Sequence, residues 1–307
     1  MSGTLPFTKV EGLGNDFVVV DLRGSAASSG AADAWSPQDP RVVRAICDRH
    51  FGVGADGVLA VLSSARGDAR MRVLNADGSE AEMCGNGIRC VAKVLHDSDP
   101  SLRRSSLRIE TGAGVLECGL ETTEGVVRTV AVEMGRPRLT RDEIPVAPGG
   151  GERVVRGAIE AAGRHFQFTG VSMGNPHAVI FVDDPAIELR ALAETFGPTL
   201  EHAPTFPRRT NVEFARIREG EIDLVVWERG CGITLACGTG ACATVVAAEL
   251  EGRLPPGREV AVNLPGGTLR ITVAPDYSGV RMRGPATTVF EARLDLSRLM
   301  SSSSSSS

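Results

Sequence analysis

The sequence lacks several features that would place it in common functional classes. No apolar run in its 307 residues reaches 18, the length of a membrane-spanning helix. The N-terminal stretch MSGTLPFTKVEG has neither the basic start nor the apolar run of a signal peptide. The formal net charge is -5 and the basic residues are scattered, which argues against nucleic-acid binding. We therefore expect a cytosolic protein that acts on a small molecule, with no membrane or nucleic-acid partner.

Residues that would hold a cofactor or a metal are also scarce. Lys9 and Lys93 are the only lysines, so a pyridoxal phosphate Schiff base has few candidates. The seven cysteines are an odd number, which argues against a disulfide framework. Cys237 and Cys242 have a C-x4-C spacing, but no C-x2-C or histidine pair accompanies it, which disfavours zinc and thioredoxin-type chemistry. We expect reduced thiols, no cofactor and no metal.

The sequence does contain one unusual turn twice. AEMCGNGIRC (81–90) and TLACGTGAC (234–242) each place a cysteine before a Gly-x-Gly turn where a helical pattern begins. Neither turn has the lysine that a phosphate-binding loop needs after its glycines. Because one turn falls in each half of a chain long enough for two cores, we expect two domains.

These turns suit acid–base chemistry on an anion. A cysteine at a helix N-terminus feels the positive end of the helix dipole, which favours the thiolate and lowers the thiol pKa. The free N–H groups of the turn can hold a carboxylate, which glycine allows to come close. Two such turns across a cleft could remove an α-proton with one thiolate and return a proton to the opposite face with the other thiol.

Only two of the seven cysteines have this context. An isolated cysteine is most often a packed core residue, and we assign that role to Cys47, Cys90, Cys118 and Cys242. Cys84 and Cys237 are the candidate catalytic residues.

Apolar spacing and turn residues predict helices and strands in both halves. Helices are predicted at 41–50, at 87–96 and in the run from 241 to 252. Strands are predicted at 57–63, 70–75, 154–160, 165–172, 178–183, 211–217 and 222–228. The polar stretch 24–40 is predicted to be a loop, and the serines 301–307 a low-complexity tail outside the fold.

Seven stretches carry a family resemblance. They are GLGNDFVVVD (12–21), CDRHFGVGADGV (47–58), NADGSEAEMCGNGIRC (75–90), ETGAG (110–114), MGNPHAVIFV (173–182), RTNVEF (209–214) and WERGCGITLACGTGACA (227–243). In these stretches and in their order the sequence resembles the diaminopimelate epimerase family of pyridoxal-independent isomerases. The paired cysteine turns are shared with the wider proline racemase superfamily. GNDF, NADGSE and WERG are more specific to the diaminopimelate branch.

The resemblance implies roles at the reacting end of the substrate. Cys84 and Cys237 would be the two bases. The N–H groups of Gly85, Asn86, Gly238 and Thr239 would hold the carboxylate at the reacting centre. The ammonium there would be contacted by Asn15 and Glu228. His177 would sit beside one cysteine and help to set its proton state.

The distal amino-acid end would be held by Asn75, Asn175, Asn211 and Arg229, through amide hydrogen bonds and one guanidinium–carboxylate pair. Neutral amides and a single arginine suit such a zwitterionic group without excess charge.

Three positions depart from the family pattern. Gly57 stands where some members have a supporting glutamine, and Ile233 stands where glutamate is common. Cys231 is an additional thiol, which could be inert or could form an inactivating disulfide under oxidation. None of the three removes a base or a carboxylate ligand.

The implied fold is mixed α/β (α+β), with two pseudo-symmetric domains, each a curved, mostly antiparallel sheet wrapped around a central helix. The first domain would span 1–132 plus a returning strand at 284–299, and the second 133–283. Residues 300–307 would be a disordered serine tail. The family also implies a homodimer.

Three functional hypotheses remain open at this stage. The first is cofactor-independent epimerisation of LL-2,6-diaminopimelate to the meso form, a step in lysine and peptidoglycan precursor synthesis. The second is a proline or hydroxyproline racemase, whose compact ring substrate would not need the residues that hold a distal amino-acid end. The third is a non-catalytic amino-acid-binding protein, which would not need two cysteines placed as bases.

Overall fold

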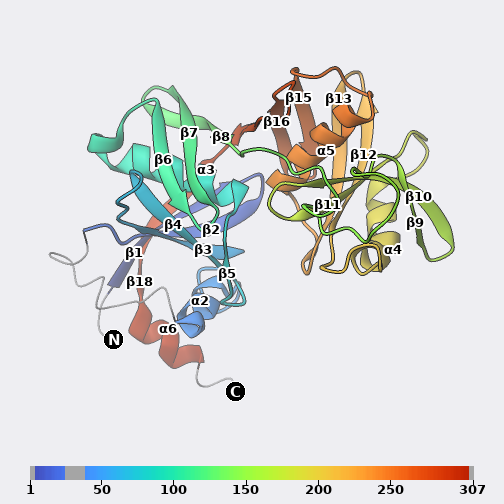
Figure 1. Ribbon diagram of the computed structural model, residues 1–307. Helices are drawn as coiled ribbons and strands as arrows, with labels where there is room; N and C mark the ends of the chain where they lie inside the picture. Colours follow the sequence, from blue (N-terminus) through green and yellow to red (C-terminus); the bar gives the residue numbers. More distant parts are fainter. Residues whose placement is uncertain (1–3, 25–38, 304–307) are drawn as a thin grey trace. The chain divides into compact units, whose positions relative to one another are not determined.

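A computed structural model describes residues 4–24 and 39–303 of the chain. These residues form two compact units, one within Met1–Val132 and Gly284–Ser307 and the other within Glu133–Arg283. Each unit has its own sheet and helices (Figure 1). Most of the loop predicted at 24–40, and the last four serines, lie outside the described residues.

The sheet of the first unit is built from eight long strands and one short one. They are β1 (Thr4–Gly12), β2 (Asn15–Asp21), β3 (Gly57–Leu62), β4 (Ala69–Asn75), β5 (Glu80–Ala81), β6 (Ser106–Thr111), β7 (Gly114–Thr123), β8 (Val126–Glu133) and β18 (Thr287–Asp295). They pair in the order β18-β1-β2-β3-β4-β6-β7-β8, and β5 pairs with the end of β4.

Two pairs in this sheet, β2–β3 and β4–β6, are parallel. Parallel neighbours require a long crossover connection, which is usually a helix. The two crossovers contain α2 (Pro40–Cys47) and α3 (Gly85–Ser98). The rest of the sheet is antiparallel.

The second unit repeats this arrangement. Its strands are β9 (Gly157–Ala161), β10 (Arg164–Ser172), β11 (Pro176–Phe181), β12 (Asn211–Arg218), β13 (Glu221–Glu228), β14 (Gly232–Ile233), β15 (Glu259–Leu264), β16 (Gly267–Val273) and β17 (Val280–Pro285). The order is β9-β10-β11-β12-β13-β15-β16-β17, with β14 beside β13.

The parallel pairs of the second unit, β11–β12 and β13–β15, are again connected through helices. These are α4 (Leu189–Glu201) and α5 (Gly238–Leu250). The predicted fold, two pseudo-symmetric units of mostly antiparallel sheet around a central helix, is therefore confirmed.

The central helices α3 and α5 are enclosed by their sheets. Strands β1, β2, β3, β4, β6, β7 and β18 contact α3, and β10, β11, β12 and β16 contact α5 (Figure 1). Every residue of α3 from Gly85 to His96 is buried. A helix that is apolar on all sides belongs in a core, and the sequence ACATVVAA of α5 is of this kind. The first turn of each helix is thereby fixed by the surrounding sheet.

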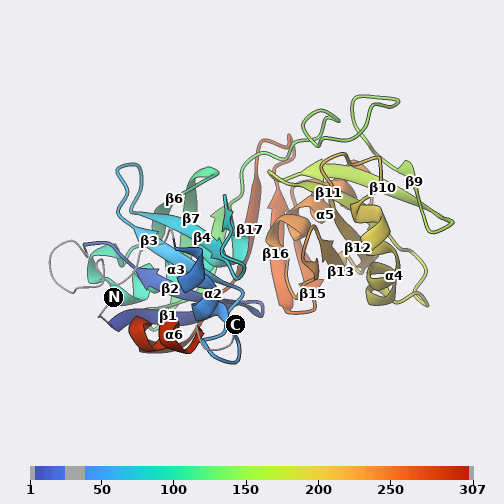
Figure 2. The same cartoon turned by 90° about the horizontal axis from the view of Figure 1, so that it is seen from below.

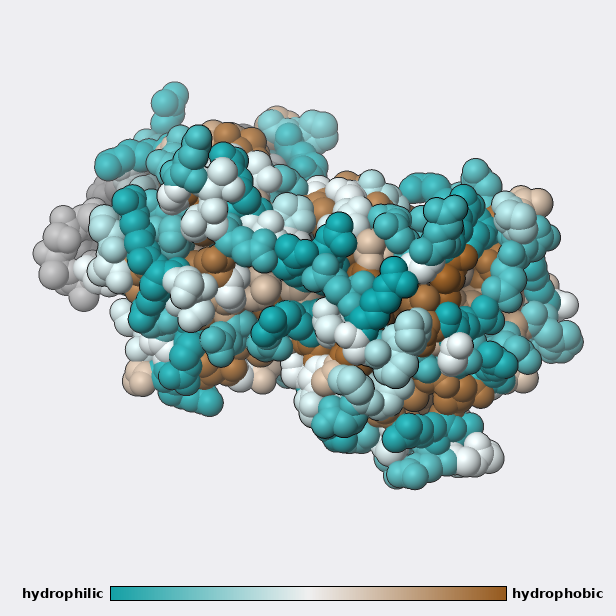
Figure 3. Space-filling model, turned by 90° about the horizontal axis from the view of Figure 1, so that it is seen from above, coloured by the Kyte–Doolittle hydropathy of each residue, from teal (hydrophilic) through white to brown (hydrophobic). Residues whose placement is uncertain are grey.

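The other helices cover the outer faces of the sheets. In the first unit α2 and α6 (Leu296–Ser303) lie side by side (Figure 2) and bury Ile46 and Leu296 in one core. In the second unit α4 packs on β12 and β13, and Leu192 and Leu200 join a core with Phe214. A short 3-10 helix, η1 (Pro100–Leu102), follows α3. Hydrophilic residues cover most of the face drawn in Figure 3, with hydrophobic patches between them.

The structure differs from the predicted elements in several places, of which the largest are these. Helix α4 has no predicted counterpart, because Gly197 and Pro198 within it read as a helix break. The strand predicted from 154 begins at Gly157. Helices α3 and α5 begin two or three residues early, since each is capped by the cysteine before its glycines. Helix α6 has no predicted counterpart and continues into the serine run as far as Ser303, so the predicted tail begins later than residue 300; the Ser301 hydroxyl donates to the Arg298 carbonyl of the preceding turn.

Candidate active site

Cys84 is the N-cap residue of α3. Its backbone is extended, with φ -138° and ψ 115°, and its sulfur accepts a hydrogen bond from the Gly87 N–H at 3.3 Å. A Cβ on Gly87 would lie 3.1 Å from the Leu59 side chain, so glycine permits the close packing of this turn. The thiol is half-buried.

Cys237 occupies the same place at α5. Its φ is -119° and its ψ is 106°, and its sulfur accepts from the Gly240 N–H at 3.4 Å. A Cβ on Gly240 would lie 3.0 Å from Glu213 Oε1 and 3.2 Å from the Cys237 sulfur. The repeated sequence thus forms the same cysteine-capped turn in both units, and in the second unit a carboxylate lies directly beside it.

The surroundings of Cys237 favour the neutral thiol. Burial raises the pKa of Cys237 well above its usual value, and the nearby carboxylates of Glu228 and Glu213 raise it further. The Thr239 hydroxyl and the Gly240 N–H lower it only in part. The helix dipole alone predicts a lowered thiol pKa, and for Cys237 that prediction is wrong, because loss of water and two acidic neighbours outweigh the dipole.

Glu228 is also held in a partly desolvated place at the end of β13. Thr234 donates a hydrogen bond to its Oε1. Burial raises the pKa of Glu228, and hydrogen bonds from Thr234 and Cys237 oppose that increase. The carboxyl group and the thiol are therefore direct neighbours.

His177 lies behind this turn on β11 and is fully buried. Its Nδ1 is 2.7 Å from Glu213 Oε1, and its Nε2 is 3.0 Å from Asn175 Oδ1. Asn175 Nδ2 in turn donates to the Thr239 hydroxyl at 3.3 Å. The structure thus brings His177, Asn175, Thr239 and Cys237 together in one unit.

Glu213 was missed by sequence reasoning. It occurs in the stretch RTNVEF but received no role. A signal was present, because Glu213 is an acidic residue in a strand whose neighbours Val212 and Phe214 are fully buried, and charged residues are rarely buried without a partner.

Asn211 and Arg229 are linked to each other. The Asn211 amide donates to the Pro176 carbonyl at 2.8 Å and accepts from the Arg229 N–H at 2.9 Å. The Arg229 guanidinium is exposed and donates to the Arg208 carbonyl at 3.1 Å. Asn211 therefore has both ends of its amide engaged within the protein and positions the chain at Arg229.

In the first unit, Asn15 and Asn86 form a pair beside Cys84. Asn86 Nδ2 donates to Asn15 Oδ1 at 3.2 Å, and Asn15 Nδ2 donates to Asp56 Oδ2 at 2.6 Å. Arg89, with no exposed surface, donates to Asn86 Oδ1 at 3.0 Å. Asp56 and Arg89, two further residues missed from the sequence, fix the orientation of both amides.

Asn75 makes a local contact. Its Nδ2 donates to Ser79 Oγ at 2.9 Å across the turn after β4, and the residue is exposed. The structure therefore places the Asn75 amide within its own turn and does not join it to the pair formed by Asn15 and Asn86.

The three departures from the family pattern lie in different surroundings. A Cβ on Gly57 would lie 2.7 Å from the Leu74 carbonyl oxygen, so a side chain there needs a backbone shift. Ile233 on β14 pairs with Trp227 and packs on the core of the second unit. Cys231 is exposed in the turn between β13 and β14.

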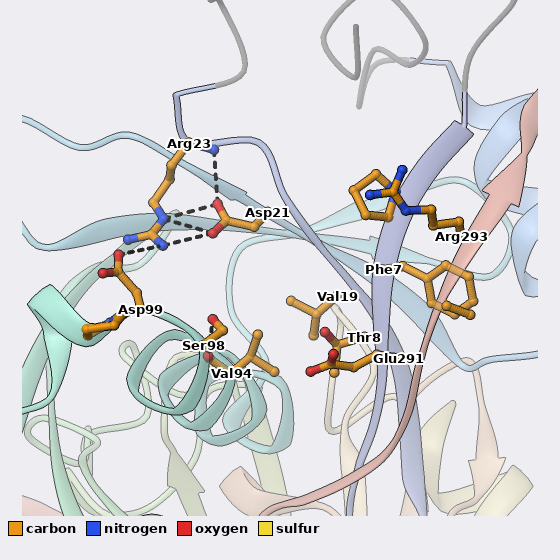
Figure 4. A pocket seen from close by; sticks show the side chains of 13 residues that line it. Phe7, Thr8, Val19, Asp21, Arg23, Val94, Ser98, Asp99, Glu291 and Arg293 are labelled. Carbon is orange, nitrogen blue, oxygen red and sulfur yellow. Dashed lines mark hydrogen bonds and ion pairs between the residues drawn. The ribbon is translucent and has the colours of Figure 1, made fainter. Parts of the chain in front are cut away.

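A separate pocket of about 700 Å³ opens in the first unit, and the predicted site residues do not line it. The Arg23 guanidinium at its edge contacts Asp21 at 2.8 Å and Asp99 at 3.2 Å (Figure 4). Within the described residues no group of three or more His, Cys, Asp or Glu could hold a metal ion, and no helix is long and apolar enough to cross a membrane.

Comparisons with known proteins agree with the repeated fold. Solved structures with similar folds include a hydroxyproline epimerase from Agrobacterium vitis, with a TM-score of 0.66 and 18% identity over 95% of this chain and 92% of that chain. A probable proline racemase from Agrobacterium radiobacter has a TM-score of 0.68 and 14% identity over 95% and 93%. At such low identity these structures show the fold alone.

Sequence comparison is more specific. The family model described as diaminopimelate epimerase matches residues 7–140 and 169–289. The diaminopimelate epimerase of Pelotomaculum thermopropionicum is 50% identical over 92% of this chain and 96% of its own length. That of Desulfitobacterium hafniense is 47% identical over 94% and 98%. The chain therefore belongs to the diaminopimelate epimerase family.

Proposed function

We propose that the protein epimerises LL-2,6-diaminopimelate to meso-diaminopimelate, using Cys84 and Cys237 as its two acid–base groups and no cofactor. The observation that most strongly supports this function is that the same cysteine-capped helix turn occurs in both units. The relatives named above carry that activity in their names. The product would enter lysine and peptidoglycan precursor synthesis.

The reaction would proceed by two proton transfers at one Cα. A thiolate removes the α-proton, and the electron pair left on carbon is delocalised into the carboxylate. A thiol then donates its proton to the opposite face of the carbon, which inverts the centre. The first sulfur ends as a thiol and the second as a thiolate. Because Cys237 is held as a thiol, we assign it the donor role in this direction and Cys84 the base role.

The N–H groups at both helix ends would stabilise the charge that develops on the carboxylate. Those of Gly85 and Asn86 begin α3, and those of Gly238 and Thr239 begin α5. Fixed donors of this kind are stronger away from water and do not need to reorganise during the reaction. Asn15 and Glu228 would hold the ammonium group, consistent with the amide and carboxylate oxygens that they carry.

The distal amino-acid end would be bound by the exposed Arg229 guanidinium with Asn75 and Asn175. A guanidinium binds a carboxylate through two parallel hydrogen bonds. Asn211 would act by positioning Arg229, because its amide is buried and engaged at both ends within the protein. Asn175 is only partly buried and keeps a second Nδ2 hydrogen for the substrate.

We further propose that the protein is a homodimer of the reducing cytosol. Strand β18 pairs with β1 and leaves Val289 and Phe290 exposed, at 55% and 44%. An edge strand with exposed apolar residues tends to pair with another chain. The cytosol is proposed because Cys84 and Cys237 would have to stay reduced to act as acid and base, and disulfides rarely form in that compartment. Light scattering of the wild type and of Phe290→Asp would test the dimer; a monomeric wild type would contradict it.

The function is tested by proton exchange at Cα. Reduced protein is incubated with LL-diaminopimelate in D₂O, and the product is followed by NMR and chiral chromatography. We expect deuterium to enter as the meso isomer appears, and expect Cys84→Ala and Cys237→Ala each to stop conversion while the exposed Cys231→Ala converts normally. Exchange of proline or hydroxyproline with diaminopimelate untouched would overturn the substrate assignment, and no exchange with any of them would favour a binding protein.

A further inference from the structure

Five residues of the second unit form one chain of hydrogen bonds. It runs from Glu213 to His177 at 2.7 Å, from His177 to Asn175 at 3.0 Å and from Asn175 to the Thr239 hydroxyl at 3.3 Å. The Thr239 hydroxyl lies 3.5 Å from the Cys237 sulfur. Glu213, a residue with no role in the chemistry described above, is thereby connected to the proposed proton donor.

The direction of this chain follows from its middle residue. Asn175 donates through Nδ2 to Thr239, so the atom that it presents to His177 is the carbonyl oxygen Oδ1. A carbonyl oxygen only accepts, and the Nε2 of His177 must therefore carry a proton. The Thr239 hydroxyl accepts from Asn175, and once Cys237 is a thiolate, which can only accept, the hydroxyl donates its own hydrogen to the sulfur. Each donor in the chain points toward Cys237.

This direction fixes how many protons Glu213 and His177 hold. With a proton on Nε2, a neutral imidazole has a bare Nδ1, which cannot donate to Glu213 Oε1 at 2.7 Å. The contact then needs a second proton, either on Nδ1 or on the carboxyl group. The pair therefore holds one proton more than a carboxylate beside a neutral histidine, and it is neutral overall.

Burial agrees with a neutral pair. The side chains of Glu213 and His177 are both fully buried, and Glu213 Oε2 has no hydrogen-bond partner among the described residues. A lone buried carboxylate would be costly there. Burial accordingly raises the pKa of Glu213, His177 opposes that rise and Glu228 adds to it. The charged or titratable groups facing the pair are Cys237 from α5 and Glu228 from β13.

We propose that Glu213 is a positioning residue: it keeps one proton shared with His177, and this proton directs a chain of hydrogen-bond donors to the sulfur of Cys237. When the Cys237 thiol gives its proton to the substrate carbon, the thiolate that remains accepts from the Thr239 hydroxyl and the Gly240 N–H. The shared proton also offsets the negative charge that Glu213 would otherwise place beside that thiolate. The inference rests on the proposed function of Cys237.

The kinetic test compares Glu213→Leu with Glu213→Gln. Leucine cannot donate to Nδ1, so no donor opposite that atom keeps the proton of His177 on Nε2, whereas glutamine keeps the size of the side chain and can donate to Nδ1 through its amide. We expect kcat to fall about tenfold in Glu213→Leu, the effect of about 1.4 kcal/mol, and less than twofold in Glu213→Gln, with KM changed less than twofold in both. The exposed Glu160→Gln is the matched control and should show no change. An unaltered kcat in Glu213→Leu, or an equal loss in both Glu213 variants, would overturn the positioning role.

A double-mutant cycle with Thr239→Val separates this role from a merely structural one. Valine removes the hydroxyl that ends the chain and retains the backbone N–H. If Glu213 acts through the chain, Glu213→Leu should lower kcat less than twofold in the Thr239→Val background. Losses that simply multiply would show that Glu213 acts independently of Thr239, and the proposal would be wrong.

A readout without turnover is the ¹⁵N NMR spectrum of histidine-labelled protein, with His177 assigned through His177→Gln. We expect Nε2 to carry a proton and the Nδ1 signal to lie toward the protonated range, the latter shift being lost in Glu213→Gln. An unprotonated Nε2 in the wild type would mean that the hydrogen bonds run in the opposite direction, and it would overturn the inference. Should the wild type not epimerise diaminopimelate, the proposed function fails, whereas the His177 spectrum still decides whether the proton is shared.

Discussion

The carboxylate of Glu201, on α4, accepts a hydrogen bond at 2.8 Å from the indole Nε1 of Trp227, on β13. Its second oxygen accepts the Gly230 N–H at 3.0 Å. Glu201 is only 3% exposed. One buried side chain therefore ties the helix to both sides of Glu228 and Arg229, the pair proposed to hold the two ends of the substrate.

Removing the indole donor should loosen this connection. In Trp227→Phe, Glu201 loses one partner in a buried place, which costs about 1–3 kcal/mol. We expect the free energy of unfolding in urea to fall by that amount and KM for diaminopimelate to rise severalfold. Phe51→Leu, which changes an aromatic ring that is 75% exposed, is the control and should alter neither value. An unchanged KM with normal stability in Trp227→Phe would show that Glu201 does not position the turn.

The acidic surroundings of Cys237 predict its reactivity. Because the carboxylates of Glu228 and Glu213 raise the pKa of Cys237 beyond the effect of burial, Glu228→Gln should lower that pKa and increase the thiolate fraction at pH 8. We expect Cys237 to react faster with iodoacetamide in the variant, as followed by mass spectrometry of its peptide. The exposed Cys231 provides the internal control. Slower alkylation of Cys237 in Glu228→Gln would contradict the electrostatic explanation.

The tight glycine of the second turn should not tolerate a methyl group. In Gly240→Ala the new Cβ lies 3.0 Å from Glu213 Oε1 and 3.2 Å from the Cys237 sulfur, closer than ordinary contacts. We expect kcat to fall at least tenfold, because both groups must move. In Gly119→Ala, on β7, the closest neighbour is 3.8 Å away, and this control should keep its activity. Equal kcat values for the two variants would show that the tight turn is unimportant.

The repeated turn was readable from the sequence because its signal is local. A cysteine before Gly-x-Gly and an apolar run define a capped, buried helix without reference to the rest of the chain. The chain of partners behind Cys237 is not local: Glu213 and His177 are 36 residues apart and meet because β11 and β12 are parallel neighbours. Such contacts depend on strand register, which a single sequence does not reveal.

Helix α4 shows a different limit. Gly197 and Pro198 are usually helix breakers, yet here the glycine is required by packing, since a Cβ would lie 2.5 Å from the Trp227 ring. Tertiary contact thus overrides local propensity. The prediction of a lowered thiol pKa for Cys237 was wrong for a similar reason. The helix dipole can be predicted from the sequence, whereas burial and neighbouring carboxylates depend on tertiary contacts.

Glu249 near the end of α5 predicts a pH dependence of stability. Both of its carboxylate oxygens are buried, and neither makes a hydrogen bond of full geometry with the described residues. Burial raises the pKa of Glu249 to about 7, and the nearby Gly257 N–H opposes that rise only in part. The folded protein therefore holds this proton more tightly than the unfolded chain, whose glutamates titrate near 4.5. The contribution of this proton to the free energy of unfolding is complete below pH 4.5 and is lost as the pH rises to about 7.

Glu249→Gln removes this titration. At pH 8 we expect the variant to unfold at a higher urea concentration than the wild type, with a free energy of unfolding larger by about 1–2 kcal/mol. We expect this difference to disappear near pH 4.5. Glu117→Gln, at an exposed position on β7, should shift neither value. The measurement is a series of urea titrations from pH 4.5 to 8.5. A constant difference at all pH values would mean that Glu249 stays ionised in the folded protein, with its carboxylate reached by water rather than held dry at the end of α5.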